Sequence, residues 1–393
     1  MKILMLGWEL PPYNSGGLGV ACYQLAKALA SHGADIQFVL PSTANHDNPT
    51  FMKVLSPNAV DSDPKRPPVT ALNPYTSDIE SVRALQDEYE DFVKQLIEVE
   101  RPDVIHAHDW LTLGAGMRAK QLSGAPLIAH VHATEFDRAG GEWGNPLIHE
   151  VEHHGLLMAD HIVAVSNATK QLIVDRYDIP ADKIEVIHNS AELLLQHSTD
   201  VAQYRYIERL KLEGYTVVVT IGRLTLQKGL GHFLRAAALA HTRFGRFLFV
   251  IAGDGEQRDE LIALSADLGI SDAVLFTGFV RGKALRDIYN LADVFVMSSV
   301  SEPFGLTALE AAQHRTALSI TNQSGVREVI HGALSYDYWD EQKLADQLIA
   351  LALSESLRDE LAHNAVQEVF QMSWQKVAAR FVTRYRALGS TSI

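Results

Sequence analysis

Short apolar runs alternate with amphipathic helical patterns along almost the whole chain. In the first half, the runs that predict strands are Lys2–Leu6, Asp35–Leu40, Asp103–Ala107, Pro126–His132, His161–Val165 and Lys183–Ile187. In the second half they are Thr216–Ile221, Phe247–Ala252, Val274–Thr277, Val294–Ser298 and Ala317–Thr321. Because strands that are buried on both faces are short and uniformly apolar, this alternation predicts an α/β fold. Its parallel sheets are expected to carry helices on both faces.

The alternation is interrupted in two places. Residues Leu193–Gly214 show no clear period and are interpreted as a linker, and Asn45–Pro74 are rich in Pro, Asn, Asp and Ser, which indicates a surface excursion. The 393 residues exceed one ordinary domain. We therefore predict an N-terminal domain at residues 1–200, a second domain at residues 201–372 and a C-terminal helix at residues 373–393.

Charge and cysteine content restrict the environment and the partners. Cys22 is the only cysteine, so no intramolecular disulfide can form and a reducing compartment is expected. Neither a signal-peptide pattern nor an apolar stretch of about 18 residues occurs. We therefore expect a cytoplasmic protein without a membrane span. The formal net charge of -14 disfavours nucleic acid and anionic lipid as partners.

A glycine-rich loop follows the first predicted strand. In GWELPPYNSGGLG, Gly16, Gly17 and Gly19 stand just before a helical pattern. Glycines at this point let the backbone approach an anion, and the first turn of a helix offers N–H donors. The spacing matches neither the dinucleotide pattern G-x-G-x-x-G nor the phosphate-binding pattern G-x-x-x-x-G-K-[ST]. An anion site and an ordinary tight loop therefore both stay open.

Two histidine pairs lie on neighbouring predicted strands. His106 and His108 form one H-x-H pair, followed by Asp109, and His130 and His132 form the other. Alternate residues of a strand face the same side, so a zinc site has to be considered. There is no cysteine partner and no H-E-x-x-H motif, and histidines near strand ends often bond a carbonyl or carboxylate. We therefore expect no metal, and we expect His132 to point into a ligand cleft.

Two basic residues follow the first strand of the second domain. The run IGRLTLQKG places Arg223 and Lys228 in the loop between this strand and the next helix. A guanidinium fork and an ammonium point charge beside a helix N-terminus suit a diphosphate. They would stabilise the charge that builds on a leaving phosphate without a metal. The alternative is a solvated loop with two ordinary cations.

Two glutamates frame the start of a later helix. The run SSVSEPFGLTALEAAQ places Glu302 before the helix and Glu310 about one turn inside it. The N–H groups of Gly305 and Leu306 are expected to hold phosphate. The two carboxylates can accept hydrogen bonds from several sugar hydroxyls. Glu302 alone would be explained by compensation of the helix dipole, but its combination with Pro303 and the residues that follow is more specific.

These motifs together resemble those of retaining GT-B glycosyltransferases of glycosyltransferase family four. The matching runs are Glu302…Glu310, GRL…QKG, the AGDG of Ala252–Gly255, the TGFV of Thr277–Val280 and the N-terminal GGLG. The resemblance extends over about residues 1–388 in the family's order. Within the group, GWELPP…GGLG and HAHDW look most like glycogen and starch synthases. The resemblance implies two Rossmann-like domains that face a deep cleft.

The resemblance also implies roles for individual residues. It implies catalytic roles for His132, Arg223, Lys228 and Glu302, and an acceptor side formed by Asp109 and His132. The residues implied in donor binding are Gly16, Gly17, Gly19, Asn189, Arg223, Lys228, Gly253, Phe279, Val280, Glu302, Phe304, Gly305, Leu306 and Glu310. The sequence departs from the family where Ser190 and Glu192 replace the glycine and aspartate of an N-G-V-D turn.

The activity implied is sugar transfer from a nucleoside diphosphate sugar, with ADP- or UDP-glucose favoured and an α-glucan as the favoured acceptor. No cofactor is expected. Asp61 and Asp63 form a D-x-D, but they lie among prolines in an aperiodic loop and are rejected as metal ligands. A nucleotide-sugar epimerase or hydrolase and a non-catalytic sugar-binding relative stay as alternatives. A phosphorylase is disfavoured because no lysine stands between Lys283 and Lys343.

Overall fold

The computed structural model divides the chain into two compact units, each with a sheet of its own. It describes residues 1–14, 16–41, 49–57, 79–191 and 204–389. Unit 1 comprises Met1–Glu135, Asn145–Asn189 and Trp374–Ile393, and unit 2 comprises Phe136–Gly144 and Ser190–Ser373. The predicted boundary between residues 200 and 201 lies outside the described residues, and so do Asp61, Asp63 and Glu192.

Unit 1 is built on a seven-stranded parallel sheet, with strands in the order β3-β2-β1-β4-β5-β6-β7. The strands are β1 (Lys2–Leu6), β2 (Asp35–Val39), β3 (Lys53–Leu55), β4 (Val104–His108), β5 (Leu127–Val131), β6 (His161–Ala164) and β7 (Ile184–Val186). Every residue of β4, β5 and β6 is buried, which explains their unbroken apolar pattern apart from histidines. The strand order reverses between β1 and β4, so the switch point of this doubly wound sheet lies between these two strands.

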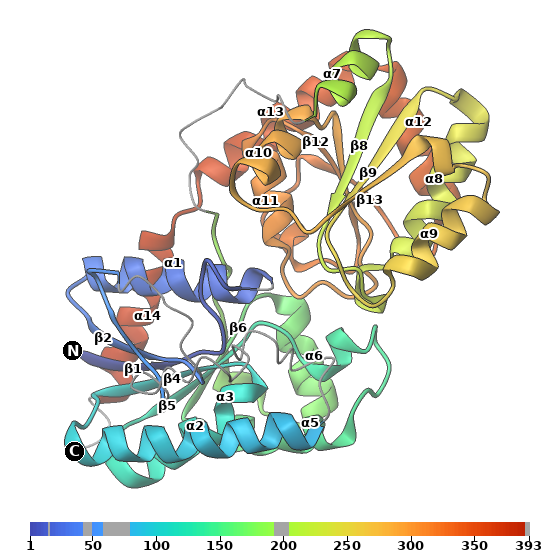
Figure 1. Ribbon diagram of the computed structural model, residues 1–393. Helices are drawn as coiled ribbons and strands as arrows, with labels where there is room; N and C mark the ends of the chain where they lie inside the picture. Colours follow the sequence, from blue (N-terminus) through green and yellow to red (C-terminus); the bar gives the residue numbers. More distant parts are fainter. Residues whose placement is uncertain (15, 42–48, 58–78, 192–203, 390–393) are drawn as a thin grey trace. The chain divides into compact units, whose positions relative to one another are not determined.

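Helices cover both faces of this sheet. They are α1 (Gly17–Ser31), α2 (Ile79–Val99), α3 (Trp110–Ser123), α5 (Pro146–Met158), α6 (Asn167–Tyr177) and α14 (Trp374–Gly389). Figure 1 shows α2, α3 and α5 on one face, with α1 and α14 on the other. Glu185 forms ion pairs with Arg380 (2.9 Å) and Arg384 (2.7 Å) of α14. The last helix of the chain therefore packs within the N-terminal unit.

Unit 2 repeats the architecture with a six-stranded parallel sheet in the order β10-β9-β8-β11-β12-β13. The strands are β8 (Thr216–Ile221), β9 (Phe247–Ala252), β10 (Val274–Gly278), β11 (Val294–Met297), β12 (Ala317–Thr321) and β13 (Ala333–Tyr336). Here the order reverses between β8 and β11. The predicted fold class of two doubly wound parallel sheets is confirmed.

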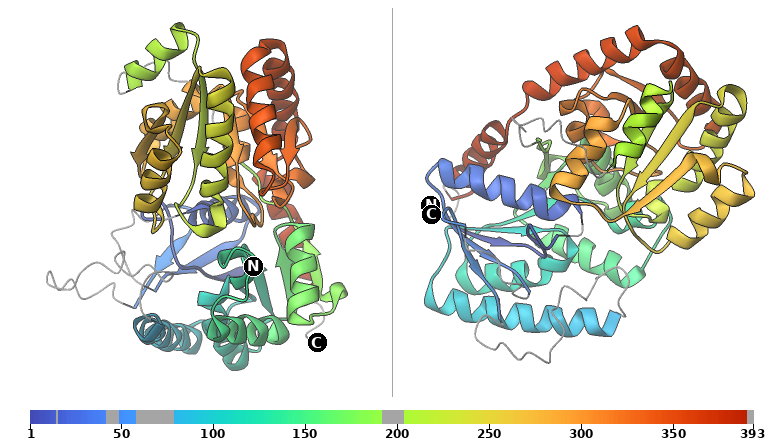
Figure 2. Two further views of the ribbon diagram at one scale, coloured as in Figure 1. Left: turned by 90° about the vertical axis from the view of Figure 1, so that its right-hand side faces the viewer. Right: turned by 45° about the horizontal axis from the view of Figure 1, so that its top comes forward.

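The helices of unit 2 also lie on both faces of their sheet (Figure 2). They are α7 (Arg205–Leu212), α8 (Leu230–Phe244), α9 (Arg258–Asp267), α10 (Gly282–Leu291), α11 (Leu306–Gln313), α12 (Glu341–Leu353) and α13 (Glu355–Phe370). Side-chain caps begin two of them, since Asp340 accepts from the amide of Lys343 and Ser354 from that of Leu357. The short α4 (Glu135–Arg138) spans the point where the chain passes from one unit to the other.

The structure differs from the sequence prediction at a few short elements. The predicted linker contains α7, whose buried Ile207 packs into the core of unit 2. The predicted excursion at Asn45–Pro74 contains β3, and β13 was not predicted at all. Both strands lie at the edges of their sheets. Among the described residues, no helix combines the length and apolar character needed to cross a bilayer.

Candidate functional site

The predicted site residues gather at the carboxyl ends of the strands in each unit. In unit 1, the glycine loop follows β1 and Asp109 follows β4, so they flank the switch point between these strands. In unit 2, the loop with Arg223 and Lys228 follows β8, and Glu302 follows β11, the other side of the second switch point. Open α/β sheets bind ligands at these positions because the loops there diverge to opposite faces.

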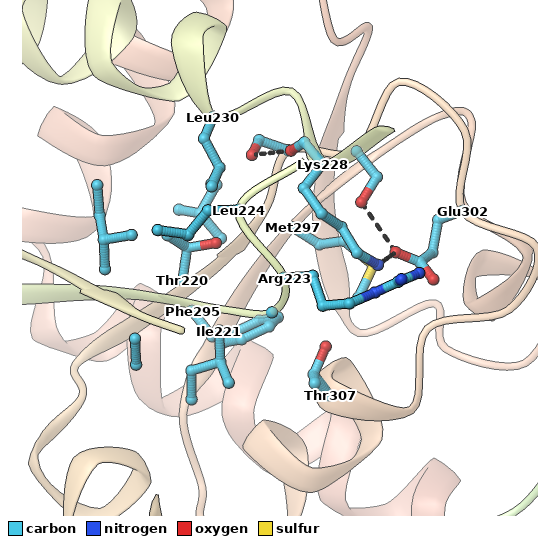
Figure 3. Close-up of a pocket in the computed structure, with 16 residues that line it drawn as sticks. Thr220, Ile221, Arg223, Leu224, Lys228, Leu230, Phe295, Met297, Glu302 and Thr307 are labelled. Atoms are coloured by element: carbon cyan, nitrogen blue, oxygen red, sulfur yellow. Dashed lines mark hydrogen bonds and ion pairs between the residues drawn. The ribbon is translucent and has the colours of Figure 1, made fainter. Parts of the chain in front are cut away.

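A pocket that is open to solvent lies at the switch point of unit 2 (Figure 3). Its polar lining includes Arg223, Lys228 and Glu302, and Figure 3 shows both basic side chains directed toward Glu302. Its apolar lining includes Phe295 and Met297 of β11. A concave pocket with an apolar wall and a few converging charges is the usual form of a small-molecule site.

Lys228 and Glu302 form an ion pair at the rim of this pocket. Lys228 Nζ donates to Glu302 Oε2 at 2.6 Å, and Ser299 Oγ donates to the same oxygen at 2.8 Å. The side chains of Lys228 and Glu302 are only 22% and 11% exposed. The pair joins two loops 74 residues apart in the chain. An ammonium carries three N–H donors, so Lys228 can hold Glu302 and a phosphate oxygen together.

The loops around the pocket approach each other so closely that two positions have room only for glycine. Gly229, the N-cap of α8, has φ +61, and a Cβ there would lie 2.2 Å from Ser298 O. Gly253 has φ +150, and a Cβ there would lie 1.8 Å from Gly222 O. At both positions a side chain would meet backbone that has no room to move. The close approach of these loops explains the glycines in QKG and AGDG.

Gly253→Ala is expected to lower the stability of unit 2 by about 2 kcal/mol more than Gly269→Ala does. Gly269 has φ +71, but a Cβ there would meet no other atom within 4 Å, so its variant isolates the backbone strain alone. The midpoints of urea unfolding compare the two variants. Equal midpoints would show that the contact between Gly253 and Gly222 is not tight in solution.

The loop before α11 is shaped by a third close contact. Gly305 caps the helix with φ +112, and a Cβ there would lie 2.9 Å from Met297 Sδ. Phe304 is buried, and its carbonyl accepts from Val326 N at 2.6 Å. Leu306 is the first residue of α11. Thr307, in the first turn of α11, lines the pocket with Arg223 and Lys228, so the helix start adds its dipole to the positive charge there.

Glu310 has a different environment from Glu302. It does not belong to the lining of the pocket described above, and its Oε2 accepts from Tyr289 Oη at 2.7 Å. Burial raises the pKa of Glu310, although the hydrogen bond from Tyr289 opposes this shift. Phe279 and Val280 follow β10, and Phe279 is 52% exposed beneath Arg281, whose Cζ lies 4.5 Å from the ring centre. The segment after β10 is therefore accessible at the surface of unit 2.

In unit 1 the glycine loop leads directly into α1. Gly16 is the N-cap and Gly17 the first residue of the helix. A Cβ at Gly19 would lie 2.8 Å from Asn14 Cβ and 3.1 Å from Glu9 O, so the loop folds tightly over the helix start. Glu9 Oε1 also accepts from Gly19 N at 3.3 Å. Asn189, which follows β7, is 5% exposed.

Asp109 holds the segment that carries His132. Its Oδ1 accepts from His132 N at 2.6 Å and from Ala133 N at 3.2 Å. The residue has φ +59, a strained value for a non-glycine residue. Strained backbone that is fixed by hydrogen bonds is common at functional sites. Asp109 therefore positions the loop after β5 besides offering a carboxylate at the sheet edge.

His106 and His108 of β4, His130 of β5 and His132 just after β5 form one cluster of rings, and this differs from the prediction. His106 and His130 are joined at 3.1 Å, and His108 and His132 at 3.0 Å, so the rings bond each other and not carbonyls or carboxylates. Burial lowers the pKa of His106 and of His132 to about 3, and those of His108 and His130 well below the usual value. The rings are therefore neutral at physiological pH.

Comparison with protein families matches both halves of the chain. Residues 15–193 match the model of Glycosyltransferase Family 4, and residues 205–368 that of Glycosyl transferases group 1. An uncharacterised glycosyltransferase of Methanocaldococcus jannaschii is 31% identical over 98% of both chains. The chain belongs to the GT-B glycosyltransferases of the family-four type.

Other relatives of this glycosyltransferase carry different names. A glycogen synthase of Mycobacterium tuberculosis is 29% identical over 84% of this chain and 80% of that one. A D-inositol 3-phosphate glycosyltransferase of Acidothermus cellulolyticus is 29% identical over 95% and 86%. The family is therefore shared by enzymes named for different acceptors.

Solved structures share the fold of this glycosyltransferase. A sucrose-phosphate synthase of Thermosynechococcus elongatus superimposes with a TM-score of 0.82 at 19% identity, over 99% of both chains. Anabaena HepE in complex with UDP and glucose gives a TM-score of 0.74 at 18% identity, over 98% of this chain and 100% of that one. The predicted GT-B fold is confirmed.

The structure adds hydrogen-bond partners of the two glutamates that the sequence prediction missed. Ser299 donates to Glu302, and Tyr289 donates to Glu310. Ser299 stands in the same short run as Glu302, so its position before the carboxylate was the available signal. Tyr289 lies on α10, and no local pattern connects it to α11. Cys22, which the sequence left without a partner, lies beside two of the histidines.

Proposed function

We propose that this glycosyltransferase moves a glucosyl group from ADP- or UDP-glucose to an acceptor hydroxyl and retains the configuration at the anomeric carbon. The observation that carries the proposal is the convergence of Arg223, Lys228 and Glu302 on one pocket at the switch point of unit 2. A fork of N–H donors, an ammonium and a helix start match a diphosphate. The carboxylate matches sugar hydroxyls.

Each part of the donor would be held by a different set of residues in unit 2. Arg223, Lys228 and the amides at Gly305 and Leu306 would hold the diphosphate, and Glu302 the sugar. The backbone at Phe279 and Val280 would meet the base. Glu310 would approach the ribose, where its hydrogen bond from Tyr289 keeps the carboxyl group oriented. No redox or group-transfer cofactor has a part in this scheme.

The proposed reaction uses charge and position, not a nucleophile of the protein. As the bond between the anomeric carbon and the phosphate breaks, negative charge grows on the diphosphate, next to Arg223 and Lys228. The acceptor hydroxyl approaches on the same face of the sugar. The departing phosphate oxygen takes its proton, and the new glycosidic bond has the configuration of the donor. Glu302 holds the sugar during the transfer.

Unit 1 would supply the acceptor side. Asp109 and His132 lie at the carboxyl edge of its sheet, and His132 is fixed through its own amide by Asp109. A neutral imidazole can donate or accept a hydrogen bond to a sugar hydroxyl. We favour an α-glucan as the acceptor, which the likeness of GWELPP…GGLG and HAHDW to glycogen synthases supports.

A donor and acceptor panel tests this function. ADP-glucose and UDP-glucose are supplied first, with glycogen and with small acceptors, and nucleotide release is measured. Release that depends on both a donor and an acceptor is expected. Release without an acceptor would indicate a hydrolase, interconversion of the donor sugar would indicate an epimerase, and donor binding without release would indicate a non-catalytic relative.

Turnover is expected to survive EDTA with little change, because Arg223, Lys228 and helix starts supply the positive charge. The measurement compares initial rates with and without the chelator, and with Mg²⁺ or Mn²⁺ restored. Loss of turnover in EDTA and its recovery with either ion would contradict the scheme. Asp61 and Asp63 would then need to be tested as ligands.

A further inference from the structure

A thiol and two imidazoles meet inside unit 1. Cys22 of α1, His108 at the end of β4 and His132 just after β5 each offer a ligand atom, and these atoms all lie within 4.8 Å of one another. Cys22 is 1% exposed and His108 is fully buried, whereas His132 is partly exposed. The three residues come from three separate elements, so the fold alone creates this group.

The donor set suits a particular class of cation. Zinc prefers thiolate sulfur and imidazole nitrogen, with bonds of about 2.3 and 2.0–2.1 Å, which places tetrahedral ligand atoms about 3.3–3.6 Å apart. His108 Nδ1 and His132 Nε2 already lie 3.0 Å apart. These two nitrogens are therefore close to the separation expected in a zinc site, and the Cys22 sulfur lies within 4.8 Å of both. Three protein ligands leave a fourth position for water or substrate.

The alternative group of His106, His108 and His130 is less suitable. Both ring nitrogens of His106 already have partners, since Nδ1 lies 2.6 Å from Tyr385 Oη and Nε2 lies 3.1 Å from His130 Nδ1. All three rings are buried, and none is partly exposed as His132 is. A cation can reach the group of Cys22, His108 and His132 more easily, because His132 is partly exposed. The thiol of Cys22 also makes this group selective for a soft or borderline cation.

We propose that Cys22, His108 and His132 form a binding site for one Zn²⁺ ion. Occupation of the site takes His132 away from the sugar, so zinc inhibits transfer reversibly; this consequence rests on the proposed function of His132. The site is distinct from any metal requirement of the reaction, which is expected to proceed in EDTA.

Metal binding is tested directly on the full chain. The protein is stripped with a chelator and dialysed against Zn²⁺, and bound metal is measured for the wild type, Cys22→Ser, His108→Asn and the control His153→Asn. His153 is an exposed histidine of α5. One equivalent is expected in the wild type and the control, with at least tenfold weaker binding in Cys22→Ser and His108→Asn.

Cobalt gives a second readout that does not depend on activity. Co²⁺ in the site should show a thiolate-to-cobalt charge-transfer band, and this band should be lost in Cys22→Ser. Since serine is close in size to cysteine, this variant is expected to fold even if His108→Asn does not. No stoichiometric binding in the wild type, or equal zinc affinity in Cys22→Ser, would overturn the proposal.

Inhibition of turnover by zinc tests the metal site and the proposed role of His132 separately. Zinc is expected to lower wild-type turnover at least tenfold at saturation, and Cys22→Ser is expected to keep its basal turnover and to need at least tenfold more zinc. Stoichiometric binding with the cobalt band but without inhibition would support the metal site and contradict the role of His132 in transfer.

Discussion

Arg223→Ala and Lys228→Ala are each expected to lower turnover about a hundredfold, which corresponds to about 3 kcal/mol of transition-state stabilisation. Both side chains line the pocket of unit 2. The charge on the diphosphate grows as the sugar leaves, so a cation held beside it stabilises the transition state more than the bound donor. The rate constant should therefore fall more than donor affinity.

Lys228→Ala has a second effect that the measurement must separate. Without Lys228, the carboxylate of Glu302, whose side chain is 11% exposed, keeps its bond from Ser299 but loses its ion-pair partner. Arg243→Ala is a matched control, because Arg243 lies at the far end of α8 and forms an exposed ion pair with Asp346. Thermal melting and steady-state rates are measured for each variant. Wild-type rates for both Arg223→Ala and Lys228→Ala would exclude the diphosphate role.

Much of the fold could be predicted because the central strands are buried on both faces. Strands such as β9 and β11 then appear as unbroken apolar runs, whatever their neighbours are. The two edge strands that were not predicted lack this signal: the residues of β13 are mostly only half-buried, and β3 has three residues and no buried one. The other two edge strands, β7 and β10, were predicted. Such strands are defined by their pairing with a neighbour, as β13 is by β12, and no local pattern reveals that pairing.

The site residues that stand in loops directly after strands could be predicted from the sequence. Arg223, Lys228 and Glu302 stand in such loops, and the switch point brings two of these loops together. The pairing of Lys228 with Glu302 joins residues 74 apart and required the structure. The same holds for Cys22, which looked isolated in the sequence because its histidine neighbours lie on β4 and after β5. Contacts between distant segments follow from topology, which local patterns do not specify.

Glu302→Ala is expected to lower turnover roughly a thousandfold, and Glu302→Gln only about tenfold. Glutamine keeps the size of the side chain and one carbonyl acceptor for sugar hydroxyls and for Lys228. Alanine removes both and leaves the Lys228 ammonium without the 2.6 Å contact that now holds it. Glu341→Gln is a matched control, since Glu341 is paired with Arg235 elsewhere in unit 2. Its rate should equal that of the wild type.

The configuration of the product decides what Glu302 does. An inverting enzyme needs a general base on the face opposite the leaving group, whereas the proposed reaction uses the departing phosphate as the base on the same face. An α-linked product is therefore expected from an α-linked donor, in the wild type and in both Glu302 variants. Proton NMR of the first product distinguishes the anomers by their coupling.

A β-linked product would contradict retention, and a trapped covalent adduct of glucose on Glu302 would contradict the positioning role. The contacts of this carboxylate favour positioning: one oxygen accepts from both Lys228 and Ser299. Two donors on the same oxygen stabilise its negative charge and lower its nucleophilicity. A nucleophile would leave an uncharged ester there, and Lys228 would lose its anionic partner in the intermediate. A carboxylate that only holds the sugar keeps its ion pair with Lys228 through the whole reaction. The tenfold loss expected in Glu302→Gln and the thousandfold loss expected in Glu302→Ala both follow from this pair of Lys228 and Glu302.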